Sequence, residues 1–113
     1  MDAQTFIITE IPPSTNGLFA TVGNRRVRTA KYRAWSEAAR WEVLAQKPRK
    51  IIGPVALDVR VKRPNARSDV GNRLKALEDL LTGLVYADDK QIQIITIAWD
   101  ATAPGCIVTV RPA

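Results

Sequence analysis

The segment from residue 55 to residue 63 constrains the fold more than any other part of the chain. Apolar and polar residues alternate along it, as a strand with one buried face requires. The apolar set is Val55, Leu57, Val59 and Val61, and the polar set is Asp58, Arg60 and Lys62. A sheet with one apolar face needs a second layer to cover it, so we expect helices packed on one side of a sheet.

Two segments have the periodicity of amphipathic helices. The first runs from about residue 29 to 46, begins at Thr29, a residue type that often caps helices, and ends before Pro48. Its apolar stripe is Tyr32, Trp35, Ala39 and Val43. The second runs from about residue 69 to 81 and stops near Gly83. Its stripe is Val70, Leu74, Leu77 and Leu81.

Three more segments read as strands, at 4–11, 91–99 and 106–111. The turn formers between residues 14 and 24 predict a loop. The expected fold is therefore α/β (α+β): a small mixed β-sheet with two helices in the order β-α-β-α-β-β. A chain of 113 residues has room for one hydrophobic core, so residues 1–113 are expected to form a single domain.

Composition excludes several kinds of chemistry. The chain has no histidine, so an imidazole base, ligand or nucleophilic triad is impossible, and Cys106 is its only cysteine. Its start lacks the pattern of a secretory signal and no apolar run is long enough to span a bilayer, so we expect a cytoplasmic protein with no membrane partner. The formal net charge of +6 favours a polyanionic partner, with nucleic acid first.

The segment from residue 67 to 91 carries acidic residues in an otherwise basic chain. Each has an ordinary structural interpretation: Asp69 as a helix cap, Asp88 and Asp89 as a solvated turn, and Lys75 with Asp79 as a pair on the wet face of a helix. Together they are unusual for a protein that binds DNA, unless a divalent cation occupies the cluster.

The motifs in this chain resemble those of RusA-type Holliday junction resolvases. They are Pro-Pro-Ser-x-Asn at 12–16, Arg-x-Asp-x-x-Asn-x-x-Lys at 67–75 and Asp-Asp-x-Gln at 88–91. The resemblance implies a homodimer that uses Mg²⁺ or Mn²⁺ to nick a four-way DNA junction symmetrically, with branched DNA and no small molecule as its substrate. It assigns catalysis to Asp69, Lys75 and Asp89. It also implies roles in DNA recombination and repair, in a family often carried by prophages.

The chain departs from the family pattern at one position. The family commonly has a second carboxylate two residues after the first, and this chain has Gly71 there. We expect Asp69 and Asp89 to bind the metal, with Asp79 as the first candidate to complete the site and Asp88 as the second.

The expected DNA-binding residues fall in two groups. The first precedes and enters the first helix, and the second lies near the acidic segment. They are Arg25, Arg26, Arg28, Lys31 and Arg33, and then Lys62, Arg63, Arg67, Asn72 and Arg73, with Arg60 nearby. Trp35 and Trp41 are expected in the core or a dimer contact, and Phe19 is the candidate to insert at a branch point.

Two other functions compete with this hypothesis. The chain could bind structured nucleic acid without cleaving it, having lost metal affinity through Gly71. It could also be a small regulatory protein whose positive surface contacts an acidic protein. Metal-dependent cleavage of a synthetic junction separates the first from the nuclease, and strong salt-dependent DNA affinity argues against the second.

Overall fold

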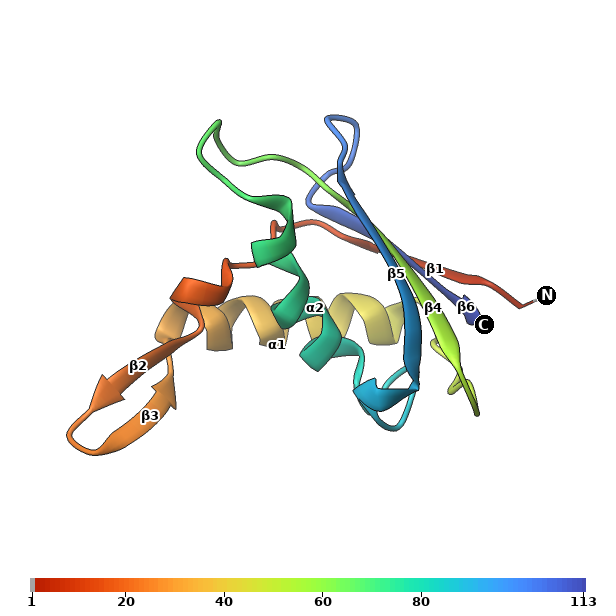
Figure 1. Ribbon diagram of the computed structural model, residues 1–113, viewed down its shortest axis with the longest axis horizontal. Coiled ribbons are helices and arrows are strands. Elements are labelled where there is room, and N and C mark those ends of the chain that lie inside the picture. The colour runs from red at the N-terminus through yellow and green to blue at the C-terminus, as the bar shows by residue number, and fades with distance from the viewer. Residues whose placement is uncertain (1) are drawn as a thin grey trace.

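A four-stranded mixed sheet covered on one face by two helices forms the body of the protein. Figure 1 shows the computed structural model, which describes residues 2–113. The sheet contains β1 (Gln4–Ile8), β6 (Cys106–Pro112), β4 (Val55–Val61) and β5 (Ile92–Trp99), in that spatial order. Strands β4 and β5 are parallel, and the other neighbouring pairs are antiparallel. The predicted α/β (α+β) class and mixed sheet are confirmed.

The alternation that predicted strand β4 forms the centre of the core. Val59 lies opposite Val108 of β6, and Leu57 lies opposite Val110. All four side chains are buried, whereas Arg60 on the other face is exposed. Burying one face of each strand against the helices is the main stabilising contribution in such a fold.

Helix α1 (Ala30–Ala45) begins as the sequence predicts. The hydroxyl of Thr29 accepts a hydrogen bond from the backbone N–H of Tyr32 at 3.2 Å, which satisfies one of the free donors of the first turn. The predicted stripe is buried, and it comprises Tyr32, Trp35, Ala39 and Val43. Trp35 also donates from Nε1 to the carbonyl of Glu10 at 3.0 Å, so its ring is part of the core. Trp41 is 66% exposed and lies outside the core.

The crossover between the parallel strands β4 and β5 contains the second helix. Parallel neighbours cannot be joined by a tight turn, so the chain must cross over the sheet. It does so through a short 3₁₀ helix, η2 (Val70–Arg73), followed by α2 (Leu74–Leu81), and Gly83 lies just beyond with a φ of 90°. The buried side of α2 comprises Ala76, Leu77, Leu80 and Leu81. None of the helices in the described chain is long and apolar enough to cross a membrane.

A β-hairpin occupies part of the segment that was predicted to be a loop. Strand β2 (Phe19–Val22) pairs antiparallel with β3 (Arg25–Arg28), and a two-residue turn at Gly23 and Asn24 joins them. The loop prediction was wrong here because these strands are short and bury almost nothing, so they lack the apolar alternation by which a strand is recognised. The hairpin projects away from the body, next to the start of α1 (Figure 1).

Candidate active site

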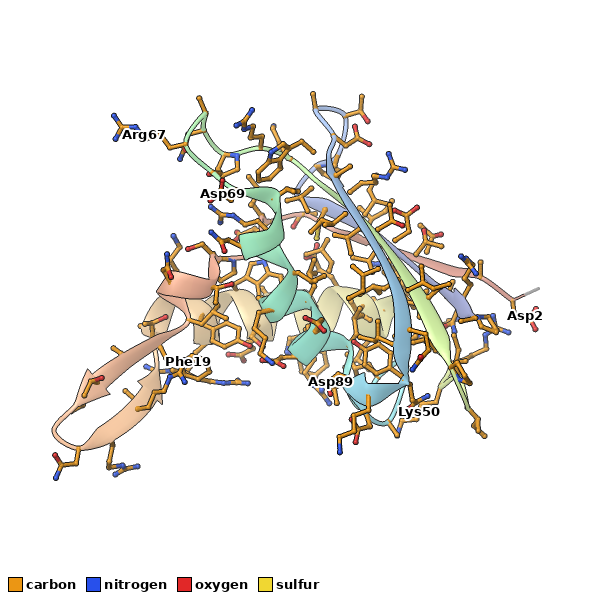
Figure 2. The ribbon with its side chains drawn as sticks, in the orientation of Figure 1. Asp2, Phe19, Lys50, Arg67, Asp69 and Asp89 are labelled. Atoms are coloured by element: carbon orange, nitrogen blue, oxygen red, sulfur yellow. The ribbon has the colours of Figure 1, made fainter. Side chains whose placement is uncertain are left out.

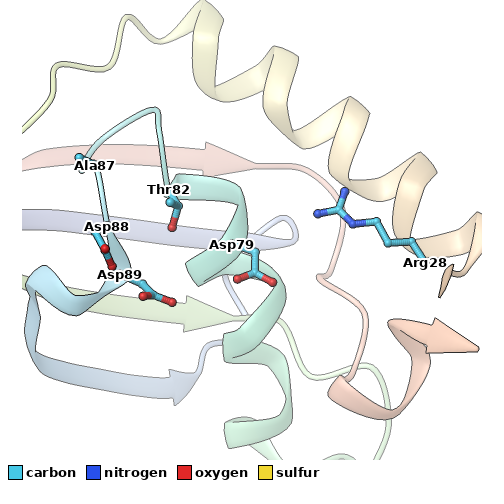
Figure 3. A pocket seen from close by; sticks show the side chains of 6 residues that line it. All are labelled: Arg28, Asp79, Thr82, Ala87, Asp88 and Asp89. Atoms are coloured by element: carbon cyan, nitrogen blue, oxygen red, sulfur yellow. The ribbon is translucent and has the colours of Figure 1, made fainter. Parts of the chain in front are cut away.

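A pocket of about 440 Å³ lies where α2, the turn before β5 and the base of the hairpin meet. Its lining residues are Arg28, Asp79, Thr82, Ala87, Asp88 and Asp89. Figure 3 shows Asp79 on α2 and Asp89 on the turn as neighbours, with the Arg28 guanidinium on the far side of Asp79. The pocket therefore gathers carboxylates and a cation from three segments that are distant in sequence.

Asp79 holds the side chain of Lys75. The Lys75 ammonium lies 3.3 Å from Oδ1 of Asp79, one turn away on α2. The hydrogen bond and the charge of Asp79 raise the pKa of Lys75, and Glu78 and Asp89 raise it further. Lys75 is therefore positively charged at neutral pH and paired with a carboxylate that lines the acidic pocket.

The second oxygen of Asp79 is also engaged. The hydroxyl of Tyr32, on α1, donates to Oδ2 of Asp79 at 3.3 Å. Burial raises the pKa of Tyr32, and the carboxylate of Asp79 adds to the effect, so the phenol keeps the proton that it donates. With one oxygen on Lys75 and the other on Tyr32, Asp79 orients the lysine rather than presenting two free oxygens.

Glu78 belongs to the same acidic group, and the sequence analysis missed it. Burial raises the pKa of its carboxyl; Lys75 opposes this shift, while Asp89 and Asp79 reinforce it. The available signal was its position three residues after Lys75, a spacing at which helical side chains are neighbours. The sequence favours Asp79 instead, because Asp79 lies four residues after Lys75, the usual spacing of an ion pair on a helix.

Asp88 and Gln91 build the turn that presents Asp89. Asp88 precedes the 3₁₀ helix η3 (Asp89–Gln91) and accepts from the backbone N–H of Lys90 at 2.9 Å, a bond that lowers the pKa of the Asp88 carboxyl. The side chain of Gln91 accepts from the N–H of Asp88 and donates to the carbonyls of Ile51 and Gly53, both at 2.9 Å. The motif Asp-Asp-x-Gln thus contains two turn-forming residues, which leave Asp89 directed at the pocket.

Asp69 lies at the other end of the crossover. It precedes η2 in an extended conformation, and its side chain makes no capping hydrogen bond, so the helix-cap interpretation does not account for it. Figure 2 shows Asp69 and Asp89 beyond opposite ends of α2. The four residues of η2 and the eight of α2 lie between Asp69 and the turn, a span of roughly 20 Å.

The described carboxylates of a single chain do not converge on one point. Among residues 2–113, no group of three or more His, Cys, Asp or Glu side chains is arranged to hold a metal ion. The structure brings Asp79, Asp88 and Asp89 to one pocket and leaves Asp69 far from it. Ligand oxygens must lie about 2.1 Å from Mg²⁺, so Asp69 and Asp89 of a single chain cannot share an ion.

The position that departs from the family pattern has open space around it. A Cβ atom added at Gly71 would meet no atom within 4 Å, and its φ lies outside the left-handed region. The backbone of η2 therefore does not require glycine, and a carboxylate at residue 71 would fit two positions after Asp69.

The basic residues flank both ends of α2. Arg25, Arg26 and Arg28 lie on β3, and Lys31 and Arg33 follow at the start of α1; Lys62, Arg63 and Arg67 lie on the loop that leads to Asp69. Arg60 is instead paired with Asp58 at 3.3 Å. Each end of the crossover therefore has its own group of cations.

Two residues expected to contact DNA make contacts within the protein, Arg73 through its side chain and Asn72 through its backbone only. Arg73 donates to the carbonyl of Pro12 at 2.8 Å, and burial lowers the pKa of its guanidinium. The backbone carbonyl of Asn72 accepts from the hydroxyl of Thr15 at 3.1 Å. The Pro-Pro-Ser-x-Asn motif is therefore packed against η2 and helps to fix the backbone next to Asp69.

Phe19 is unavailable for insertion into DNA in this conformation. The Arg26 guanidinium covers its ring at 4.3 Å from the centroid, and the ring meets Tyr32 edge to face at 6.0 Å. The aromatic side chain supports the base of the hairpin instead.

A basic α+β protein with an acidic pocket, a fixed lysine and flanking arginines has the features of a nucleic-acid-processing enzyme. The model of the family described as endodeoxyribonuclease RusA matches residues 10–111, and the chain belongs to this family. A search of curated proteins gives no significant match. Membership implies a nuclease that acts on branched DNA and resolves Holliday junctions in recombination.

Proposed function

We propose that the protein is a homodimeric, divalent-metal-dependent endonuclease that resolves four-way junctions by paired symmetric nicks, with Asp69, Lys75 and Asp89 as its catalytic residues. The observation that carries this proposal is the acidic pocket around Asp89, next to the lysine that Asp79 holds, in a chain with a net charge of +6. A cation in this pocket would reconcile its negative charge with a DNA substrate.

The free edge of the sheet supports the homodimer. Strand β5 is an edge strand of eight residues, and its sequence, IQIITIAW, contains no charge and no proline. Ile94 is 48% exposed and Ile95 is 42% exposed. Edge strands that remain unpaired usually carry charges, prolines or bulges that prevent pairing, and a long apolar edge without them readily adds another strand. A second copy of β5 is the occupant we propose.

Pairing of β5 with its own copy about a two-fold axis would also complete the metal site. Such a pair is antiparallel, so the start of one strand lies beside the end of the other. Asp89 lies just before the start of β5, whereas the loop leading to Asp69 is near its end, where the Arg63 guanidinium stands 5.6 Å from the Trp99 ring and η2 contacts the strand. Asp69 would therefore approach Asp89 of the partner subunit.

In the dimer, each site would draw on carboxylates from both chains. Hard oxygen ligands from Asp69 and Asp89 of the partner subunit suit Mg²⁺ or Mn²⁺. When bound, such an ion lowers the pKa of a bound water and offsets charge on the reacting phosphate. Lys75 contributes a point charge near the scissile phosphate, held there by Asp79. Two such sites related by a two-fold axis would account for paired incision.

Mixed dimers of Asp69→Asn and Asp89→Asn chains test this arrangement. If each site takes one residue from each subunit, both homodimers are inactive, while the heterodimer has one intact site and nicks a single strand of the junction. If the site lies within one chain, the heterodimer is as inactive as the homodimers, which would contradict the shared site.

Metal binding gives a second readout that does not depend on cleavage. Electron paramagnetic resonance of Mn²⁺ should detect about half the parent's bound ion per heterodimer and almost none in either homodimer. Glu37→Gln, which removes an exposed carboxylate from α1, is the matched control and should bind Mn²⁺ like the parent.

The runner-up function is junction binding without cleavage, and Gly71 is the observation that favours it. With one family carboxylate absent, metal affinity could fall below what catalysis needs. Tight binding to a four-way junction without any nicking in Mg²⁺ or Mn²⁺ would establish this alternative.

A further inference from the structure

The β2–β3 hairpin has no hydrophobic core of its own. Both strands are largely exposed, and Val22, next to the turn, is 62% exposed. The hairpin projects from the body so that neither the sheet nor the helices cover it (Figure 1). An isolated two-stranded hairpin is at best marginally stable in water, so its persistence here requires local support.

Stacking between arginines and aromatic rings provides that support. The Arg26 guanidinium lies 4.3 Å from the centroid of Phe19, and Arg28 lies 4.7 Å from that of Tyr32. At the tip, Gly23 has a φ of 62°, which suits a tight two-residue hairpin turn with glycine in its first position. The two guanidiniums are thereby supported by aromatic rings, while both arginines remain exposed.

All charged residues of the hairpin are positive. Residues 19–28 include three arginines and no acidic residue. Among the described residues, both salt bridges lie elsewhere, between Arg60 and Asp58 and between Lys75 and Asp79. The hairpin arginines are therefore available to an external polyanion.

The base of the hairpin opens onto the acidic pocket. Arg28, the last residue of β3, lines that pocket together with Asp79 and Asp89. A polyanion bound along the hairpin would therefore extend into the pocket.

We propose that the hairpin enters the major groove of the duplex arm that flanks the scissile phosphate. A two-stranded ribbon is the size of element that a major groove about 12 Å wide admits. Each strand has four residues, which span about 13 Å, or roughly four base pairs beyond the pocket. Arg25 and Arg26 then contact the arm, while Arg28 stays at the pocket. This inference rests on the proposed function, because it takes the pocket as the place of cleavage.

The test compares two double variants that lose the same charge. Arg25→Gln with Arg26→Gln alters the hairpin, and Arg49→Gln with Lys50→Gln alters exposed cations outside the hairpin, on the loop after α1, near the Lys50 label in Figure 2. Binding to a four-way junction with 15-base-pair arms is measured in EDTA across a salt series. We expect the slope of log K against log salt to fall by about two for the hairpin variant, since each lost phosphate contact contributes about 0.9, and to stay unchanged for the control.

Methylation of guanine N7 with dimethyl sulfate identifies the groove. For the parent, methylated guanines within about four base pairs of the cleavage position should interfere with binding, and the hairpin variant should lose that interference. Equal slope changes in the two double variants, or a methylation pattern that the hairpin variant leaves intact, would overturn the inference. So would an unchanged slope with a loss of dimer on sedimentation, because the hairpin would then be a subunit contact.

These measurements are independent of the proposed function because they need no metal and no cleavage. A parent protein that cleaves junctions normally, while its hairpin variant keeps the parent's slope and interference pattern, overturns only the hairpin inference. A parent that shows the hairpin footprint and never cleaves overturns the nuclease proposal instead.

Discussion

Tyr32 and Asp79 are joined by a hydrogen bond that links the core of the protein to its candidate active site. The phenol belongs to the buried stripe of α1, and the carboxylate that it contacts also holds Lys75. Because the Tyr32 ring also supports Arg28, one buried side chain orders both a cation at the pocket and the pair that directs Lys75. Core packing therefore positions the polar groups of the site.

Asp89 and Asp88 are adjacent carboxylates with different expected roles. Asp89→Asn should reduce junction cleavage by two orders of magnitude or more, since it removes a proposed metal ligand, and should leave junction binding in EDTA nearly unchanged. Asp88→Asn is the matched control, because asparagine caps a helical turn about as well as aspartate and should preserve the bond to Lys90. The cleavage rates of the two variants are compared on a synthetic junction. Equal losses of cleavage would show that Asp88 and Asp89 do not differ in role.

Gly71→Asp should strengthen the metal site. The structure leaves open space for the new side chain, which would stand two residues after Asp69, where the family has a carboxylate. We expect Mn²⁺ to bind several-fold more tightly, because an added carboxylate raises the charge of the site. Gly71→Asn provides the uncharged control. Isothermal titration that gave the same affinity for all three proteins would show that residue 71 does not face the ion.

The Lys75–Asp79 pair predicts a pH dependence of stability. Asp79 raises the pKa of Lys75 in the folded protein, so the pair stabilises the fold fully below the unfolded pKa of about 10.5 and loses this contribution as the pH rises through the higher folded pKa. Lys75→Gln should therefore lower the free energy of unfolding by about 0.5 kcal/mol at pH 8, a small amount because the lysine is half exposed. Urea titrations should show this difference shrinking above pH 10.5. A difference that stays constant to pH 12 would indicate lost packing instead.

Substitution by alanine should destabilise the protein at Gly105 and have little effect at Gly71. A Cβ atom at Gly105 would lie 2.5 Å from the carbonyl carbon of Glu10 and 2.6 Å from the carbonyl oxygen of Ile8, and backbone atoms cannot move aside easily. Gly105→Ala should destabilise the fold by about 2 kcal/mol or more. At Gly71 the same change meets no obstacle and should alter stability by less than about 0.5 kcal/mol. Midpoints of urea unfolding compare the two directly.

Cys106 should be unreactive until the protein unfolds. The side chain is buried on β6, and burial raises the pKa of its thiol to about 12, so almost no thiolate forms at neutral pH. Ellman's reagent at pH 8 should therefore give no rapid reaction in the native state and one thiol per chain in urea. Rapid native labelling would place this end of β6 at the surface.

The sequence was sufficient for the main sheet and both helices because their residues bury one face. The alternation of apolar and polar residues around Val59 and the apolar stripe that includes Tyr32 both result from that burial. The hairpin was missed because Arg25 and Arg26 bury little and the aromatic partner of Arg26, Phe19, is seven residues away. The predicted helix already placed Asp69 at its start and Asp89 beyond its end, but the motifs alone did not show how far apart the helix holds the two carboxylates.

Helix α2 sets the distance between the two ends of the crossover. Inserting one residue within it would turn everything beyond by about 100° and move it by 1.5 Å, so Asp79 would no longer face Lys75 and the turn carrying Asp89 would be displaced. The loop at residues 64–68, in contrast, does not set the spacing of these side chains and should accept added residues. We therefore expect natural variation in chain length to accumulate in that loop, while the length of α2 stays constant because it sets the distance between Asp69 and the turn that carries Asp89.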